Sequence, residues 1–193
     1  MHEVPLTIAE HSDEDATRSD PEVNATRLRK AVDAHFVFIG RSLRGLGVAE
    51  SDVDDAIQQV FLVLSKKLPE ISELGLRAFL FQTAVRIASR ARRTRARRQE
   101  VGEETLDATA DERASPEELT EQRRARELLD RILDDMDMEL RSVLVLFEIE
   151  ELTTQEIAVL LEIPQGTAAS RLRRAREEFH ARVKRLQASG GVR

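Results

Sequence analysis

The chain of 193 residues has no cysteine, tryptophan or tyrosine, and only eight glycines and five prolines. The absence of cysteine excludes disulfides and thiolate metal sites, and it is typical of a protein in a reducing cytoplasm. No apolar run approaches the roughly 18 residues needed to cross a bilayer, and the polar, acidic N-terminus does not resemble a secretory signal. We therefore expect a cytoplasmic protein that does not enter a membrane. The abundance of Ala, Leu, Arg and Glu favours an all-α fold.

Charge is unevenly distributed along the chain, although the total of 36 acidic and 30 basic residues gives a net charge of −6. Residues 1–22 carry seven acids and one base, and residues 99–121 carry nine acids and one base. Residues 23–98 carry 15 bases and seven acids. Because nucleic-acid binding depends on the local field, the acidic total does not exclude it.

Apolar spacing divides the chain into two small helical domains joined by an acidic linker. We predict a disordered acidic tail over 1–22, helical domains over 23–98 and 116–187, a linker over 99–115 and a short tail over 188–193. Within the first domain we expect helices over 24–44, from a Ser51 cap to Pro69, and over 76–98.

The helix after Ser51 reads DVDDAIQQVFLVLSKKL and has two distinct faces. Its apolar face is expected to contain Val53, Ile57, Val60, Phe61 and Leu64. The opposite face presents Asp52, Asp55, Gln58 and Gln59.

The following helix carries seven arginines between residues 86 and 98 and no acid among them. Its apolar stripe consists of Leu80, Ala84, Ile87 and Ala91, and a second stripe consists of Arg86, Arg90, Arg93 and Arg97. A solvated basic helix end is the simplest explanation of such a stripe. Because so many uncompensated arginines repel one another, we favour a surface that meets nucleic acid.

A second basic helix lies in residues 162–177, which read EIPQGTAASRLRRARE. Thr153 and Glu156 form a capping box for the preceding helix, and a turn over 162–164 separates it from a helix that opens at Gln165. One face of the new helix holds Ala168, Leu172, Ala175 and Phe179, and the other holds Gly166, Ser170, Arg173 and Arg174. This arrangement predicts a helix-turn-helix whose second helix fits the major groove, and a plain helical hairpin with a basic exterior is the alternative.

Both basic segments resemble one family. EIAVLLEIPQGTAASRLRRARE resembles the "EIA…G-x-P-x-GTVKSRL-x-RARE" signature of region 4 of sigma factors, and DVDDAIQQVFLVL resembles the "A-x-D-x-x-Q-E-x-F" stretch of region 2. LRAFLFQTAVRIASRARR is similar to the segment that follows it in region 2. The chain therefore looks like an extracytoplasmic-function (ECF) member of the sigma-70 family over about residues 24–185.

The resemblance implies a dissociable subunit of bacterial RNA polymerase that directs initiation at promoters with −10 and −35 elements. It places the polymerase contact, to the clamp helices of the largest subunit, on Asp52, Asp55, Gln58, Gln59 and Phe61. It places −10 recognition on Phe79, Arg86, Arg90, Arg93 and Arg97. It places −35 recognition on Gln165, Gly166, Thr167, Ala169, Ser170, Arg171, Arg173, Arg174 and Arg176. An anti-sigma factor is a further partner that the resemblance allows.

The sequence departs from the family pattern at several of these positions. Phe79 stands where tryptophan is usual, and Arg86 and Arg90 stand where asparagine and aspartate are frequent. Glu151 and Glu162 stand where the pattern has glycine. At Glu162 a positive φ would cost up to about 1 kcal/mol. These departures bear on which promoter is read and leave the class unchanged.

Two other classes of function explain less of the sequence. A stand-alone helix-turn-helix regulator gives no role to DDAIQQVF or to the Arg86–Arg98 stripe. An enzyme would need a phosphate loop, a nucleophile elbow or a HExxH motif, none of which occurs, and the four histidines are scattered. We therefore expect no catalytic residue, no metal and no cofactor.

Overall fold

The computed structural model describes residues 21–101 and 128–188, in which every regular element is a helix and no strand occurs. The prediction of an all-α fold is confirmed. The expected tail over residues 1–20, the linker over 102–115, the beginning of the second domain over 116–127 and the end of the chain over 189–193 lie outside the described residues.

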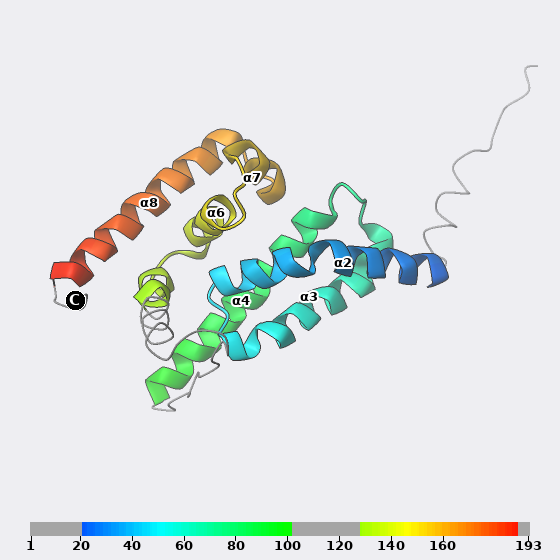
Figure 1. Ribbon diagram of the computed structural model, residues 1–193, viewed down its shortest axis with the longest axis horizontal. Helices are drawn as coiled ribbons and strands as arrows, with labels where there is room; N and C mark the ends of the chain where they lie inside the picture. Colours follow the sequence, from blue (N-terminus) through cyan, green and yellow to red (C-terminus); the bar gives the residue numbers. More distant parts are fainter. Residues whose placement is uncertain (1–20, 102–127, 189–193) are drawn as a thin grey trace, which may run out of the picture.

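The N-terminal unit consists of three α-helices, α2, α3 and α4, which all contact one another (Figure 1). Helix α2 spans Pro21–Gly45, α3 spans Val53–Lys67 and α4 spans Leu76–Val101. Single 3₁₀ turns at Glu50–Asp52 and Leu68–Glu70 connect them to the loops. The core of this unit is built from the apolar stripes of all three helices, with Ile39, Leu43, Val60, Leu64, Leu80 and Phe81 almost inaccessible to solvent.

The helix ends differ from the predicted ones in ways that local geometry explains. Helix α2 starts at Pro21, so the predicted tail over 1–22 includes two residues that belong to the helix. Proline is favoured in the first turn of a helix because the N–H that it lacks has no partner there. The prediction that Ser51 caps α3 is wrong, because a 3₁₀ turn makes Asp52 the capping residue and the Ser51 hydroxyl donates to Asp52 at 3.1 Å. Helix α4 continues to Val101, into the predicted linker.

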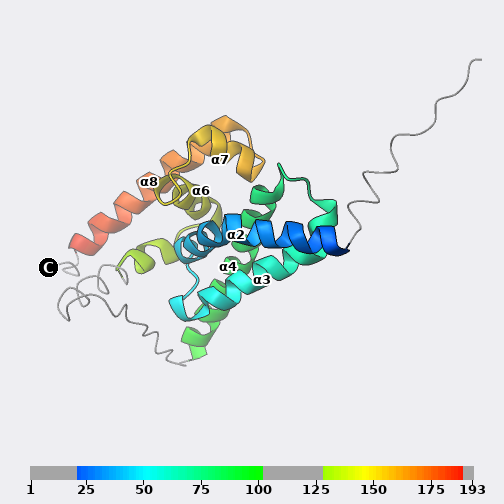
Figure 2. The ribbon, with the colours of Figure 1, turned by 45° about the vertical axis from the view of Figure 1, so that its right-hand side comes forward.

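The C-terminal unit consists of helical residues 128–134 followed by three α-helices. Helix α6 spans Met138–Glu148, α7 spans Thr154–Leu161 and α8 spans Gln165–Ala188. Asp137 caps α6 by accepting a hydrogen bond from the Glu139 backbone N–H at 2.8 Å. Helix α8 is the long outer element, and it packs on α6 and α7, as Figures 1 and 2 show.

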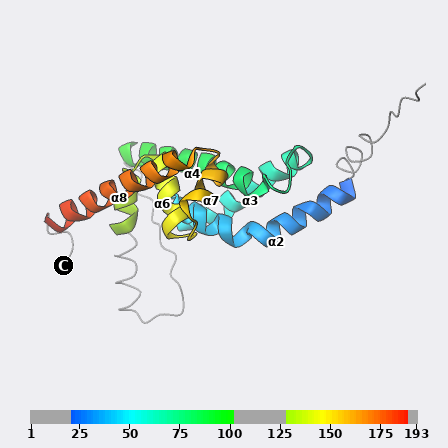
Figure 3. The ribbon, with the colours of Figure 1, turned by 90° about the horizontal axis from the view of Figure 1, so that it is seen from above.

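The two units share one hydrophobic core. Helix α6 packs against both α2 and α4, and α7 packs against α4, so that the C-terminal unit lies directly on the N-terminal one (Figures 2 and 3). Contacts within each unit are more extensive than contacts between the units. The boundary between them is therefore a real interface, although the two domains were predicted only as separate bundles.

Candidate nucleic-acid interface

Helices α7 and α8 form the predicted helix-turn-helix. The capping box is present, since the Thr153 side chain accepts from the Glu156 N–H and the Glu156 carboxylate accepts from the Thr153 N–H at 2.8 Å. Glu162 ends α7 in the left-handed conformation with φ of +55°, as its place at a glycine position suggested. Glu151, the other position where the family pattern has glycine, also has a positive φ, of +54°.

The faces of α8 are those that the spacing predicted. Ala168, Leu172 and Ala175 are buried, and Phe179 packs partly buried beside them. The remaining surface at the N-terminal half of α8 is exposed, with Thr167 half-buried at its edge. It contains Gln165, Gly166, Ala169, Ser170, Arg173 and Arg174.

Small residues make this surface approachable. A side chain added at Gly166 would meet no atom within 4 Å, so nothing in the described chain covers that position. The Ser170 hydroxyl donates to the Thr167 carbonyl at 3.0 Å, and its oxygen can still accept a hydrogen bond. A ligand can therefore come close to the α8 backbone at this end.

The four arginines of α8 near this surface fall into two pairs. Arg173 is exposed and forms an i,i+4 ion pair with Glu177 at 2.9 Å, while Arg174 is exposed and has no ion pair among the described residues. Arg171 forms an ion pair with Glu139 of α6. Arg176 pairs with Glu148 at 2.8 Å and lies over the ring of Phe147, 4.5 Å from its centroid.

The partners of Arg171 and Arg176 were missed by reasoning from the sequence. Both residues lie on the flanks of the exposed face, where they reach back to α6 instead of projecting outward. The sequence signal for these contacts is the presence of acidic and aromatic residues at the two ends of α6, namely Glu139 and Phe147-Glu148. No helical period links α6 to α8, so only the packing brings them together.

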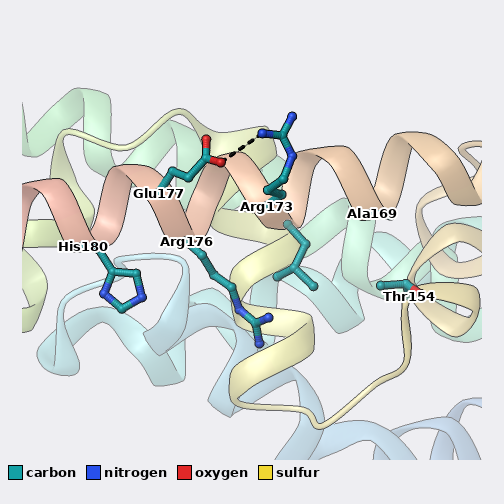
Figure 4. Close-up of a pocket in the computed structure, with 7 residues that line it drawn as sticks. Thr154, Ala169, Arg173, Arg176, Glu177 and His180 are labelled. Atoms are coloured by element: carbon teal, nitrogen blue, oxygen red, sulfur yellow. Dashed lines mark hydrogen bonds and ion pairs between the residues drawn. The ribbon is translucent and has the colours of Figure 1, made fainter.

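An open groove runs beside this surface, between α8 and the beginning of α7. It is lined by Thr154, Ala169, Leu172, Arg173, Arg176, Glu177 and His180. Figure 4 shows that Arg173 and Glu177 point to one side of α8, while Arg176 and His180 point to the other. The groove is part of the same face, with an arginine on each side of it.

The arginines of α4 also divide into two sets. Arg86, Arg90, Arg93 and Arg97 are exposed, as the predicted stripe requires, and Phe79 is half-buried and packs against the core. Arg92 and Arg95 instead bind Asp134 of the C-terminal unit. They follow the buried Ala88 by four and seven residues, so their position on the core-facing side could have been read from the helical period.

The predicted polymerase-facing surface of α3 is exposed except at one residue. Asp52, Asp55, Gln58 and Gln59 are exposed, whereas Phe61 is buried in the core and is not part of the exposed surface. Its role in polymerase binding stays a prediction. The spacing had already placed Phe61 on the apolar face, and the packing keeps it there. Leu62 and Val63, exposed to 50% and 39%, lie on the polar face instead and add apolar area to it.

Neither a metal site nor a membrane-spanning element occurs within the described residues. In residues 21–101 and 128–188 no group of three metal-ligating side chains lies close enough to hold an ion. No helix in these ranges combines the length and the apolar character that a bilayer span requires.

Comparison with known proteins finds similarity to transcription initiation factors. The family profile "Sigma-70, region 4" matches residues 126–179. The chain is 26% identical over 148 residues to the "ECF RNA polymerase sigma-E factor" of Escherichia coli strain K12, covering 72% of this chain and 78% of the relative. The sigma-E factor of Salmonella typhimurium strain LT2 gives the same values.

Two solved structures share the fold. The structure of CnrH in complex with the cytosolic domain of CnrY is 20% identical, with a TM-score of 0.58, and covers 88% of this chain and 94% of the other. The sigma factor RpoE in complex with the anti-sigma factor NepR from Bartonella quintana is 16% identical, with a TM-score of 0.57, and covers 81% and 96%.

Proposed function

We propose that this chain is a member of the ECF group of the sigma-70 family, that it binds core RNA polymerase, and that it reads a −10 and a −35 promoter element with two separate helices. Membership of the family implies polymerase binding and transcription initiation. The assignment of α8 to the −35 element, of α4 to the −10 element and of α3 to the polymerase is our own.

The −35 element is assigned to α8 because its exposed N-terminal half has the dimensions and chemistry for a major groove. From Gln165 to Arg174 the helix rises about 14 Å, similar to the roughly 12 Å width of the groove. Arg173 and Arg174 can donate two hydrogen bonds each to guanine. The exposed Arg173–Glu177 pair is weak, at about 0.3–0.5 kcal/mol, so DNA can replace it.

Arg171 and Arg176 are assigned a positioning role in the same unit. Their guanidinium groups hold α8 against α6 through Glu139 and Glu148. This leaves a reading set of Gln165, Ser170, Arg173 and Arg174, with Gly166 and Ala169 providing room for the backbone to approach the bases.

The −10 element is assigned to the exposed stripe of α4. Arg86, Arg90, Arg93 and Arg97 extend over about 16 Å of helix, the length of about five base pairs at 3.4 Å each. These side chains are suited to phosphates, because a stripe of exposed arginines offers charge without a fixed pattern of donors. Phe79 is half-buried beside them and offers part of its ring for stacking on a base.

The polymerase is assigned to the exposed face of α3. Asp52, Asp55, Gln58 and Gln59 give this face acidic and amide groups, and Leu62 and Val63 give it exposed apolar area. A polar rim around an apolar centre is typical of protein interfaces. We assign it to the clamp helices of the largest polymerase subunit, and we include an anti-sigma factor among the proposed partners.

This proposal rests on the presence of two exposed basic helix surfaces in one chain, on α4 and on α8. The chain also has an acidic face on α3, which DNA would repel. A stand-alone helix-turn-helix regulator would need only α8.

The test is transcription by core RNA polymerase with and without the full-length protein on a library of random promoter fragments. We expect transcripts only with the protein present, and start sites that align two sequence elements. Arg174→Ala should relax the upstream element, and Arg185→Ala at the exposed far end of α8 is the matched control that removes the same charge. Specific binding to an operator without polymerase, and no transcription with it, would contradict the proposal.

A further inference from the structure

Two glutamates with a left-handed backbone flank α7. Glu151 precedes the helix with φ of +54°, and Glu162 ends it with φ of +55°. Among the described residues these are the two positions other than glycine where φ is positive. A left-handed conformation is costly for a residue with a side-chain carbon and cheap for glycine. Such a cost is often kept at places where the side chain has a role of its own.

The side chain of Glu151 has a counterpart within the chain, and that of Glu162 does not. The pKa of Arg41 in α2 is raised mainly by its hydrogen bond to Glu150, and the charge of Glu151 raises it further. The Glu162 carboxylate is exposed and forms no hydrogen bond or ion pair among the described residues. Its partner is therefore to be sought outside the chain.

Glu162 is held beside the N-terminal end of the exposed surface of α8. Its backbone N–H donates to the Val159 carbonyl at 3.2 Å, which closes the last turn of α7. The next residue, Ile163, is partly buried against the hydrophobic core, so the turn is anchored on its inner side. Two residues separate Glu162 from Gln165, where α8 begins.

A duplex bound to α8 would pass close to this carboxylate. A chain of three residues spans at most about 11 Å, which is less than the roughly 12 Å width of the major groove. Glu162 therefore lies within one groove width of Gln165. The space beside it is open, because a side chain added at Gly166 would meet no atom within 4 Å.

A purely structural role explains the carboxylate less well. A negative charge near the N-terminus of a helix is favourable, and Glu162 lies just before α8. This benefit falls off beyond the first turn, and at an exposed position it is generally smaller than the cost of a left-handed backbone. Glycine would give a less strained turn at the same position.

A carboxylate beside a DNA-reading surface has few possible partners. It only accepts hydrogen bonds, and phosphates repel it. In the major groove the donors are the exocyclic amino groups of cytosine and adenine, and glutamate characteristically accepts from cytosine N4. Arg173 and Arg174 donate instead and favour guanine. The two kinds of side chain thus distinguish different bases.

We propose that Glu162 is a specificity-determining residue of the −35 contact, where its carboxylate accepts a hydrogen bond from the N4 amino group of a cytosine at the edge of the element. The inference rests on the proposed function, because it requires α8 to enter the major groove at the −35 element. Glu162 adds a position read by an acceptor to those read by the donors of Arg173 and Arg174. The side chain that strains the turn thereby extends the sequence that the surface can distinguish.

The test is the affinity of the holoenzyme for promoters that carry each of the four bases at each position of the upstream element. We expect the natural protein to prefer cytosine at one position by about tenfold, and Glu162→Gly to lose this preference while keeping its selectivity at the other positions. Glu151→Gly removes the same charge and the same backbone strain at the other end of α7, and this matched control should keep the preference. Unfolding midpoints measured in parallel show that each variant is folded.

The amino group can also be removed from the DNA. A cytosine analogue that lacks the N4 amino group should weaken the binding of the natural holoenzyme more than that of Glu162→Gly. Any effect of the analogue on the duplex alone is common to both proteins, so the difference reports the contact.

Equal losses in the two proteins, or a Glu162→Gly variant that keeps the full preference for cytosine, would overturn the inference. If the natural holoenzyme shows no selectivity anywhere in the upstream element, the proposed function of α8 fails and the inference fails with it. The two failures are therefore distinguishable.

Discussion

The Arg176 guanidinium of α8 lies over the Phe147 ring of α6, with its central carbon 4.5 Å from the ring centroid. The same side chain donates to Glu148 at 2.8 Å. Arg176 thus links two helices that are adjacent in space but separate in sequence, and on this basis we assign it a structural role.

Replacing Arg176 should therefore destabilise the protein. We expect Arg176→Ala to lower the free energy of unfolding by about 1 kcal/mol, because it removes a partly exposed cation–π contact and an exposed ion pair. Urea denaturation measures the change. Arg174→Ala, which removes no ion pair among the described residues, should leave the midpoint unchanged, and equal losses in both variants would contradict the assignment.

The arginines of α8 and α4 should differ in what they contribute to DNA binding. Arg173→Ala or Arg174→Ala should cost about 1–3 kcal/mol per lost base contact and relax specificity at one position of the −35 element. Arg93→Ala or Arg97→Ala should weaken binding to all promoters about equally and reduce the salt slope by about one. Holoenzyme binding to a set of promoter variants at several salt concentrations separates the two effects. The division fails if both pairs of variants affect all sequences alike.

The acidic face of α3 should determine polymerase affinity. Asp55→Lys reverses a charge in the centre of the proposed contact, and we expect the affinity for core polymerase to fall about tenfold, or about 1.4 kcal/mol. Asp33→Lys on the exposed side of α2 makes the same charge change elsewhere and is the control. Affinity can be measured by fluorescence anisotropy of the labelled protein. Equal affinities for the two variants would exclude this face.

The left-handed residue at the helix-turn-helix turn should be a site where stability can be gained. Glu162 has φ of +55°, a conformation that costs an L-residue about 1–2 kcal/mol and glycine much less. Glu162→Gly should therefore raise the free energy of unfolding by about 1 kcal/mol. Gln155→Gly, at the exposed second residue of α7, should lower it, because glycine is a poor helix former. Thermal unfolding of the two variants checks the opposite signs.

The capping box of α7 should make stability dependent on acid pH. Hydrogen bonds from the Thr153 backbone and side chain hold the pKa of Glu156 below its ordinary value. Because the folded state then binds the proton less tightly than the unfolded state, this contribution is present above the ordinary glutamate pKa. It is lost as the pH falls through the lowered one.

Glu156→Gln should accordingly reduce the change of the unfolding midpoint with pH in the acid range. Near neutral pH the slope of the midpoint against pH should stay nearly the same as in the natural protein. Unfolding curves between neutral and acid pH measure this. Gln155→Glu, which places a carboxylate one residue away from the box, is the control. The role of the capping box would be contradicted if the unfolding midpoints of the natural protein and of the Glu156→Gln variant changed equally with pH in the acid range.

The sequence by itself determined the features that depend on residues close along the chain. The α8 stripe of Ala168, Leu172 and Ala175 repeats with the helical period, and the capping box joins residues only three apart. Both features can be recognised in the linear sequence, because they involve residues that are close along the chain. The helix-turn-helix and the exposed arginine stripe of α4 could be predicted for the same reason. The resemblance to sigma factors depended on these same local segments.

Only the tertiary structure decided which charged residues face one another. Arg92 and Arg95 bind Asp134, Arg171 and Arg176 bind α6, and Arg141 is buried beneath the turn after α2. The helical period indicates which arginines lie on the core-facing side of α4, but it does not identify a partner about thirty to a hundred residues away. The role of each arginine is therefore set by the packing of the two units rather than by its own helix.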